Sequence, residues 1–426
     1  MLQPNGYPQA QKYNFLLKGI IYALVVLYLA NCFTPLRLHV DMLRYFAIMD
    51  CIQLGCSPDS AAAQDYLPYG YTALLLALSK TGLLNSFVIV LINCVYLFGS
   101  LYMVRKLFEA GFHSLFFLLL VLLNWTTIKF VTHPLSEMQY LFFSTGSLYF
   151  FYRYTKNKHL LSLALAFASG VIAFLTRSVG IALAAALVTS LVWQYRKELL
   201  LLIQRNKILV AVIAAIIITV TLFYKQLGLY HYTGVFTKQF TEGVGFADIL
   251  KWHFTEWAEL GFNTSADKMM HYLPSSISKI FFVLAGFLFF AGFVYILFFR
   301  KNNIPFIIKA YLFFYIILMF NWPFYDPRFW LPVLPLIIAV IVQSPFIKTK
   351  LVRALLFLLL AVYLILGILS VGYMTYTSLD KKVMARKQAN GVYRNEYETL
   401  FFGKPQSDTA NHTDPVILHV LERFNK

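Results

Sequence analysis

Charge is scarce in this 426-residue chain, and negative charge is the scarcer kind. Only 13% of the residues are charged, with 19 Asp and Glu against 36 Lys and Arg. Hydrophobic residues make up 59% and aromatic residues 18% of the chain, and the mean hydropathy is +0.66. Ordinary soluble domains do not have this balance. The composition therefore excludes a soluble globular protein and predicts an integral membrane protein.

Cysteine is also rare, and the four cysteines contain no CxxC pair of the zinc-binding kind. Cys32 and Cys94 fall in or beside apolar runs, where a thiol acts as a small apolar side chain. Cys51 and Cys56 share one polar segment, and their sequence positions leave both the disulfide and the free thiols open. We expect neither a metal nor a cofactor. The first apolar run follows a polar leader without a clear cleavage site, so we expect an anchor and not a cleaved signal peptide.

Apolar runs close to the roughly 20 residues that cross a bilayer recur along the chain, separated by short charged segments. This pattern predicts an all-α, polytopic helical bundle with about eleven spans. We expect spans at about 15–33, 84–104, 114–128, 134–152, 159–175, 178–194, 208–224, 276–299, 304–321, 329–345 and 353–372.

The distribution of charge predicts how the chain is oriented. With a cytoplasmic N-terminus, the inner segments hold 17 Lys and Arg but only two acids, and the outer side is nearly neutral. The positive-inside rule accounts for this asymmetry and for the net charge of +17, so nucleic acid is not an expected partner. We expect a plasma membrane protein, of the bacterial inner membrane type, with its C-terminus and its site outside.

Three outer segments are long enough to carry a site. Residues 1–372 are expected to form the transmembrane domain, which includes outer loops at 34–83 and 225–275, and residues 373–426 are expected to form a short outer tail. In the first loop, "DMLRYFAIMDCIQL" has apolar residues at helical spacing and predicts an interface helix. "LPYGYTALLLALSKTG" predicts a second helix that is too short to span a membrane.

The first loop supplies the leading catalytic candidate, Asp41. It lies near Arg44 and Tyr45 at the start of the expected interface helix. Its carboxylate could accept the proton of an attacking hydroxyl or amine, or it could cap the helix. Arg44 could pair with Asp41, reach a lipid phosphate or face water.

Two further outer turns carry ionisable groups between apolar helices. His133 and Glu137, in "KFVTHPLSEMQY", flank the start of a helix and could line the same cavity as Asp41, although an acid in a first turn also satisfies the helix dipole. Arg177, in "FLTRSVG", could bind a phosphate through its planar guanidinium or extend to the membrane surface.

A fourth turn, "NWPFYDPRFWLPVLPL", holds Tyr325, Asp326 and Arg328. Arg328 could be a second phosphate contact, with Asp326 holding it in place. With the expected topology all four turns lie on one side of the membrane. Their combination indicates a site for an anionic substrate.

The order of these features resembles the C-type glycosyltransferases, polytopic enzymes that use polyprenyl-phosphate sugars and include protein mannosyltransferases and lipid A aminoarabinose transferases. The resemblance rests on "VDMLRY", "LPYGYTALLLAL" with Tyr69, "HPLSEMQYLFF", "FLTRSVGIALAAAL" and "YDPRFWLPVLPLI". It implies a first-loop acid that acts as the base or orients the acceptor, so that by position Asp41 would be the base and Arg177 and Arg328 would hold the carrier phosphate. Glu137 is our second catalytic candidate. The chain departs from many members in lacking an Asp-x-Asp pair and a large soluble C-terminal domain.

The resemblance predicts a glycosyltransferase that moves a sugar from a polyprenyl-phosphate carrier to a lipid, glycan or protein acceptor. A polysaccharide polymerase or ligase would use a similar donor and is the main alternative. A transporter or flippase of lipid-linked substrates would carry polar groups or broken helices at mid-membrane, and the expected spans are nearly all apolar there. A non-catalytic scaffold is a third alternative.

Overall fold

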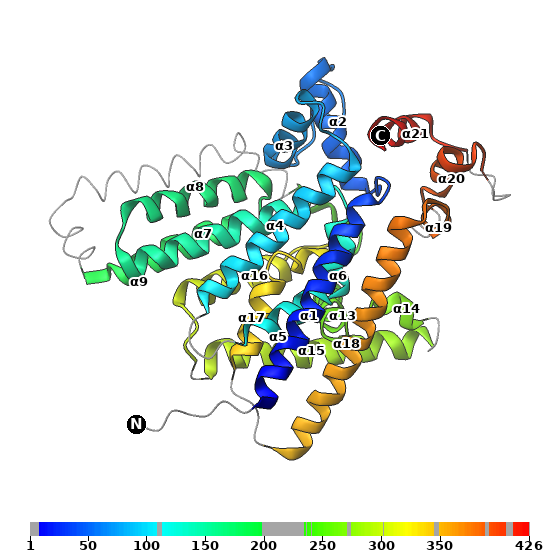
Figure 1. Cartoon of the computed structure of the whole chain (residues 1–426). Coiled ribbons are helices and arrows are strands. Elements are labelled where there is room, and N and C mark those ends of the chain that lie inside the picture. The colour runs from blue at the N-terminus through cyan, green and yellow to red at the C-terminus, as the bar shows by residue number, and fades with distance from the viewer. Residues whose placement is uncertain are drawn as a thin grey trace, which may run out of the picture.

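The computed structural model describes residues 8–108, 113–197, 234–235, 237–239, 241–270, 274–300, 302–344, 349–387, 392–405 and 412–425. Every regular element in those ranges is a helix (Figure 1). The prediction of an all-α fold is therefore confirmed for the described part of the chain. The expected span at 208–224 lies outside it.

Four helical segments are long and apolar enough to cross a membrane. They are Asn14–Phe33, Ser86–Leu107, Ser276–Phe299 and Lys350–Leu379. A fifth span results if α5 (Ser114–Leu122) and α6 (Trp125–Val131), which meet at a 64° bend, count together. The expected count of about eleven is not confirmed, because α8 (Leu160–Thr176), α9 (Gly180–Gln194), α16 (Phe306–Phe320) and α17 (Leu334–Gln343) are shorter apolar helices. These helices are compatible with an integral membrane protein.

The two ends of the chain supply helices that lie side by side. α1 (Pro8–Ala30) and α18 (Lys350–Leu379) contact each other and run in the same direction through the molecule (Figure 1). Tyr28 of α1 is fully buried and donates a hydrogen bond of 2.7 Å to the carbonyl oxygen of Leu122 at the end of α5. The first helix is therefore an integral part of the bundle.

The helix α7 (Glu137–Asn157) packs against α4 (Ser86–Leu107) and α8. Small side chains let α7 and α8 approach closely. Ser147 on α7 donates to the carbonyl oxygen of Ala166 at 2.8 Å, and a Cβ at Gly170 would lie 3.3 Å from the Ser147 hydroxyl oxygen. Close packing of this kind is typical of helices in membranes. It fixes the start of α7 relative to the end of α8.

A second helix pair, α13 (Phe246–Phe262) and α15 (Ser275–Val294), packs against the rest of the bundle. A π-helix, η2 (Tyr295–Phe299), extends α15, and the short α14 (Ala266–Met270) precedes it. A Cβ at Gly286 would lie 1.6 Å from the carbonyl oxygen of Phe254. Glycine at position 286 therefore permits the close crossing of α13 and α15.

The outer loop expected at 34–83 forms helices α2 (Val40–Leu54) and α3 (Tyr69–Lys80), joined to α1 by the 3-10 turn η1 (Asn31–Phe33). Cys51 and Cys56 form a disulfide at the end of α2. In Figure 1, α2 and α3 lie at the same end of the molecule as α19 (Lys381–Lys387), α20 (Arg394–Phe402) and α21 (Pro415–Phe424).

The C-terminal helices bind the segment that leads into α2. The Tyr397 hydroxyl accepts from the amide of Leu38 at 2.8 Å and donates to the carbonyl of Leu36 at 2.5 Å. Arg423 pairs with Asp50 of α2 at 2.9 Å. The tail is therefore a packed part of the fold and holds α2 in place.

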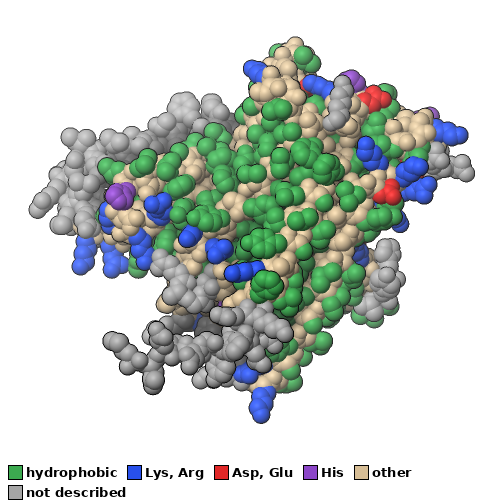
Figure 2. All heavy atoms as spheres, viewed as in Figure 1, with side chains coloured by type: hydrophobic (Ala, Val, Ile, Leu, Met, Phe, Trp, Pro, Cys, Tyr) green, Lys and Arg blue, Asp and Glu red, His purple; other side chains and the backbone are tan. Residues whose placement is uncertain are grey.

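The visible surface separates apolar from charged side chains. Figure 2 shows a broad apolar area over the middle of the bundle, with the visible acidic side chains gathered at the end that carries α2 and the C-terminal helices. Most of the visible Lys and Arg away from that end lie along the lower left edge of the same view. An apolar middle flanked by charged side chains is compatible with an integral membrane protein.

Candidate functional site

Charged side chains from distant parts of the sequence meet at one end of the bundle. Asp41 comes from the first turn of α2, Glu137 is the first residue of α7, Arg177 follows α8, and Arg328 lies in the 3-10 turn η3 (Pro327–Trp330). We call these four residues and Arg44, Asp65 and Asp326 the charged cluster. Asp41 and Arg328 are 287 positions apart in the chain, so only the folded protein creates the cluster.

Arg328 is at the centre of this cluster. Its side chain is 8% exposed. Nη2 donates to Asp41 Oδ2 at 2.5 Å, and Nε lies 2.7 Å from Asp326 Oδ2 in an ion pair without hydrogen-bond alignment. Nη1 lies 3.6 Å from Glu137 Oε1 and has no hydrogen-bond partner among the described residues. An unpaired N–H on a buried guanidinium is costly, so this atom is a candidate for binding a substrate oxygen.

Arg177 forms the second buried ion pair of the charged cluster. Its Nη1 donates to Glu137 Oε1, and the same nitrogen lies 3.3 Å from the hydroxyl oxygen of Ser136. That hydroxyl also accepts from the buried phenol of Tyr45 at 3.0 Å. The second oxygen of Glu137, Oε2, is buried without a hydrogen-bond partner in the described structure. Arg177 does not extend to the surface, because its Glu137 partner is only 1% exposed.

Arg44 forms a bidentate pair with Asp65. Nε and Nη2 each donate to one Asp65 oxygen at 2.8 Å, and Nη1 donates to Asp41 at 3.3 Å. The guanidinium also stacks on the ring of Tyr66 at 4.8 Å. Of the three roles open to Arg44 from the sequence, the structure therefore favours pairing with acids, and Arg44 orients Asp41.

The charged cluster holds four carboxylates and three guanidinium groups. Burial by itself raises the pKa of the Asp41 carboxyl, but Arg328 outweighs this effect and holds the pKa below its usual value. Asp41 is therefore ionised at neutral pH. Among the described residues no three His, Cys, Asp or Glu side chains are grouped so as to hold a metal ion. The acids of the charged cluster are paired with arginine instead.

The alternative reading of Asp41 as a helix cap is wrong. His39 is the N-cap of α2, and its Nδ1 accepts from the amide of Asp41 at 3.2 Å. A capping side chain must precede the first turn, and Asp41 already lies within it. The position still stabilises a carboxylate, because free N–H groups point toward the start of a helix.

The Pro-Tyr-Gly-Tyr turn brings α3 against the end of α8. A Cβ at Gly70 would lie 2.7 Å from backbone atoms of Leu175 and Thr176, so only glycine allows this contact. Gln139 of α7 donates to the carbonyl of Gly70 and to the hydroxyl of Thr176, both at 3.1 Å. Three helices are thus joined next to Arg177.

Three other predicted residues lie outside the charged cluster. His133 is buried, and its Nδ1 lies 2.8 Å from the carbonyl oxygen of Lys129. Tyr69 is 56% exposed at the start of α3. Tyr325 donates to Glu259 of α13 at 2.7 Å. The structure places all three near the same end of the bundle, but none contacts Asp41 or the arginines directly in the described hydrogen bonds.

Sequence reasoning missed the acids that complete the site. Asp65 was not singled out from the sequence, and α13 lies in the segment that was expected to be an outer loop at 225–275. In the structure His253, Glu256 and Glu259 of α13 are buried. Their spacing of three residues in "HFTEWAEL" puts them on one helix face. That spacing was the available signal.

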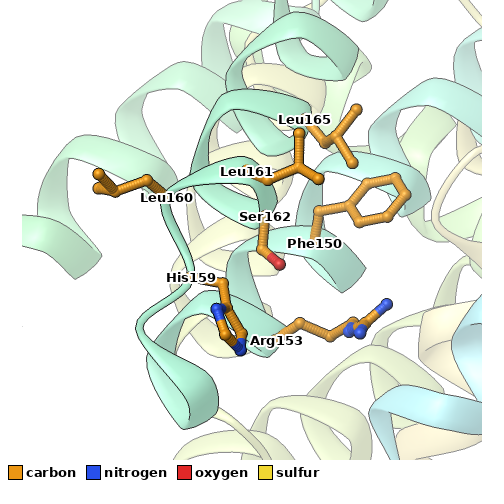
Figure 3. A pocket seen from close by; sticks show the side chains of 7 residues that line it. All are labelled: Phe150, Arg153, His159, Leu160, Leu161, Ser162 and Leu165. Atoms are coloured by element: carbon orange, nitrogen blue, oxygen red, sulfur yellow. The ribbon is translucent and has the colours of Figure 1, made fainter.

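A hollow lies at the other end of α7 and α8. It has a volume of about 270 Å³ and is lined by Phe150, Arg153, His159, Leu160, Leu161, Ser162 and Leu165 (Figure 3). Glu137 and Arg177 lie at the opposite ends of these two helices. The hollow is therefore separate from the charged cluster.

Comparison with profiles of known protein families, with curated proteins and with solved structures found no match to this chain.

Proposed function

We propose that the protein is a membrane glycosyltransferase that moves a sugar from a polyprenyl-phosphate carrier to a lipid, glycan or protein acceptor. One observation carries the proposal. Arg177 and Arg328 meet the carboxylates of Asp41 and Glu137 in a buried cluster at the end of an apolar helical bundle. An anionic lipid fits such a site, since guanidinium groups bind phosphate oxygens and apolar helices contact an isoprenoid chain.

The carboxylates occupy the guanidinium donors until a phosphate arrives. Arg328 Nη1 is buried and its N–H has no partner in the described structure, so we assign it to a phosphate oxygen that enters as the surrounding side chains move apart. As the phosphate takes over the Arg328 donors, Asp41 loses the strongest of the cations that lower its pKa, and Arg44 remains beside it. Burial then raises the pKa of Asp41, which makes the carboxylate a stronger base in the loaded site.

The chemistry is a substitution at the anomeric carbon of the sugar. The acceptor oxygen or nitrogen forms the new bond while the bond from the sugar to the phosphate oxygen breaks. Asp41 takes the proton of the acceptor, and the carrier leaves as a phosphate monoester. Arg177 and Arg328 stabilise the negative charge that develops on this leaving group.

The proposal includes the orientation of the chain in the membrane. Lys and Arg concentrate in the segments assigned to the inner side, and the charged cluster lies at the end that carries α2 and the C-terminal helices (Figure 1). We place this end outside the plasma membrane, with the N-terminus in the cytoplasm. The Cys51–Cys56 disulfide at the end of α2 supports an oxidising outer compartment.

The test is binding of a synthetic polyprenyl phosphate to the purified protein in lipid nanodiscs, compared with the uncharged polyprenol. We expect wild type to bind the phosphate in preference, and Arg328→Gln to lose at least about tenfold in affinity, which is about 1.4 kcal/mol. Arg386→Gln is the matched control, since Arg386 is an exposed arginine of α19 at the same end of the molecule. Equal binding of the phosphate and the alcohol by wild type would refute the proposal.

A further inference from the structure

The turn that carries Arg328 is held by a buried polar group on α13. Glu256 is 0% exposed. Its Oε1 accepts from the backbone amide of Asp326 at 2.6 Å, and its Oε2 accepts from the indole Nε1 of Trp330 at 2.7 Å. These two donors lie at the two ends of the turn. One carboxylate therefore fixes both ends of the segment between them.

His253 supports the same carboxylate from one turn earlier in α13. Its Nδ1 lies 2.6 Å from Glu256 Oε2, and its Nε2 lies 2.8 Å from the carbonyl oxygen of Trp322. A carbonyl oxygen only accepts, so Nε2 carries a proton. The pair therefore shares one further proton between Nδ1 and Oε2 and is neutral overall. Because the His253–Glu256 pair carries no net charge, its complete burial has a smaller desolvation cost than the burial of an ion.

A continuous series of contacts connects Glu256 to the site. Glu256 holds the amide of Asp326, and the Asp326 carboxylate accepts from the amide of Arg328 at 3.0 Å and pairs with its Nε at 2.7 Å. The Arg328 guanidinium then reaches Asp41. Trp330, at the other end of the turn, is fully buried. The turn cannot rotate without breaking the contacts of Glu256.

We infer that Glu256, supported by His253, is a positioning residue that aims Arg328 at the phosphate of the substrate. Glu256 does not contact the substrate itself. The inference rests on the proposed function, because the phosphate is the ligand that Arg328 is proposed to bind. It adds α13, a helix outside the turns that the sequence indicated, to the machinery of the site.

The variant that tests this role is Glu256→Gln, which keeps the shape of the side chain. Its amide has one acceptor oxygen, so it can serve Asp326 but must turn its NH2 group toward the indole N–H of Trp330. Two donors then face each other in a buried site. Replacing the indole as well, in Glu256→Gln/Trp330→Phe, removes the opposing donor and is expected to restore part of the loss.

Two measurements are made on these variants in nanodiscs. Hydrogen–deuterium exchange in residues 322–333 reports whether the turn is held, and it needs no ligand. Affinity for polyprenyl phosphate reports whether the Arg328 guanidinium is oriented to bind the phosphate. Lys251→Gln is the control, because Lys251 lies on the exposed face of the same helix and pairs there with Asp248.

We expect Glu256→Gln to speed exchange in residues 322–333 and to weaken phosphate binding about tenfold, with the control unchanged. The loss is expected not to add to that of Arg328→Gln, because both act through one guanidinium. Unchanged exchange would overturn the inference, and so would fully additive losses, which would mean a general structural defect. If wild type binds no polyprenyl phosphate, the proposed function fails, and exchange alone then decides whether Glu256 holds the turn.

Discussion

The Glu137–Arg177 pair gives the sharpest stability prediction. Glu137 is 1% exposed and is the ion-pair partner of Arg177, whose side chain is 18% exposed. The variant Glu137→Gln removes the negative charge and leaves the guanidinium with the Ser136 hydroxyl at 3.3 Å. An unpaired buried charge costs about 3–5 kcal/mol. We expect the free energy of unfolding to fall by that amount.

The matching change in the partner residue is Arg177→Met, which leaves Glu137 3.6 Å from Arg328. We expect it to lower the free energy of unfolding less than Glu137→Gln does. In the double variant no unpaired charge from the pair remains. Replacing a buried ion pair by uncharged side chains of similar volume is often neutral. The double variant is therefore expected to be more stable than Glu137→Gln alone, which a double-mutant cycle measures as coupling.

The assay is equilibrium unfolding in a denaturing detergent, followed by tryptophan fluorescence on the four proteins of the cycle. Lys251→Gln serves as the control, because it breaks an exposed ion pair with Asp248 and is expected to change stability little. If the losses of the two single variants simply add in the double variant, the two charges do not interact and the described geometry is wrong.

Three further predictions follow from other contacts. Burial raises the pKa of Glu259 from its ordinary 4.5 to about 8. Between these pH values the native state binds more protons than the unfolded state, so the free energy of unfolding falls as pH rises. Glu259→Gln should flatten this pH dependence when unfolding is measured at several pH values. Tyr397→Phe removes the hydrogen bonds to Leu36 and Leu38. This should lower the free energy of unfolding by about 1–3 kcal/mol and speed proteolysis of the C-terminal tail. Equal proteolysis of variant and wild type would show that the hydroxyl does not hold the tail. Reduction of the Cys51–Cys56 disulfide, which closes a short loop at the end of α2, should cost only about 2 kcal/mol in thermal unfolding.

Hydropathy and charge predicted the helical fold, because each apolar run that forms a helix is a local feature of the sequence. The two helices expected at 34–83 are present, and Asp41 lies at the start of the first of them as expected. The number of membrane spans could not be predicted in the same way, because it also depends on how the helices pack against each other. α7 contains Ser144, Thr145 and Ser147, which are buried against other helices, so its polar composition reflects packing within the bundle.

The site was predictable only as separate turns. Each turn shows an ionisable residue beside an apolar helix, and this favoured Asp41, Glu137, Arg177 and Arg328. Their pairing depends on tertiary contacts that no local pattern contains. The role of Glu256 was not predicted, because an amphipathic helix with Trp and Glu has the sequence pattern of a surface segment. Only the fold places the acidic face of this helix against the turn that carries Arg328.

The central claim is that Asp41 serves as the base in sugar transfer from a polyprenyl-phosphate carrier. The most direct test measures transfer of labelled sugar from such carriers by proteoliposomes that contain wild type, Asp41→Asn or the control Asp59→Asn, whose carboxylate is exposed in the same loop. Loss of a general base lowers the rate by about 10²–10⁴-fold. We predict that loss for Asp41→Asn at normal protein levels, with the control at the wild-type rate. Transfer by Asp41→Asn at the wild-type rate would contradict the account.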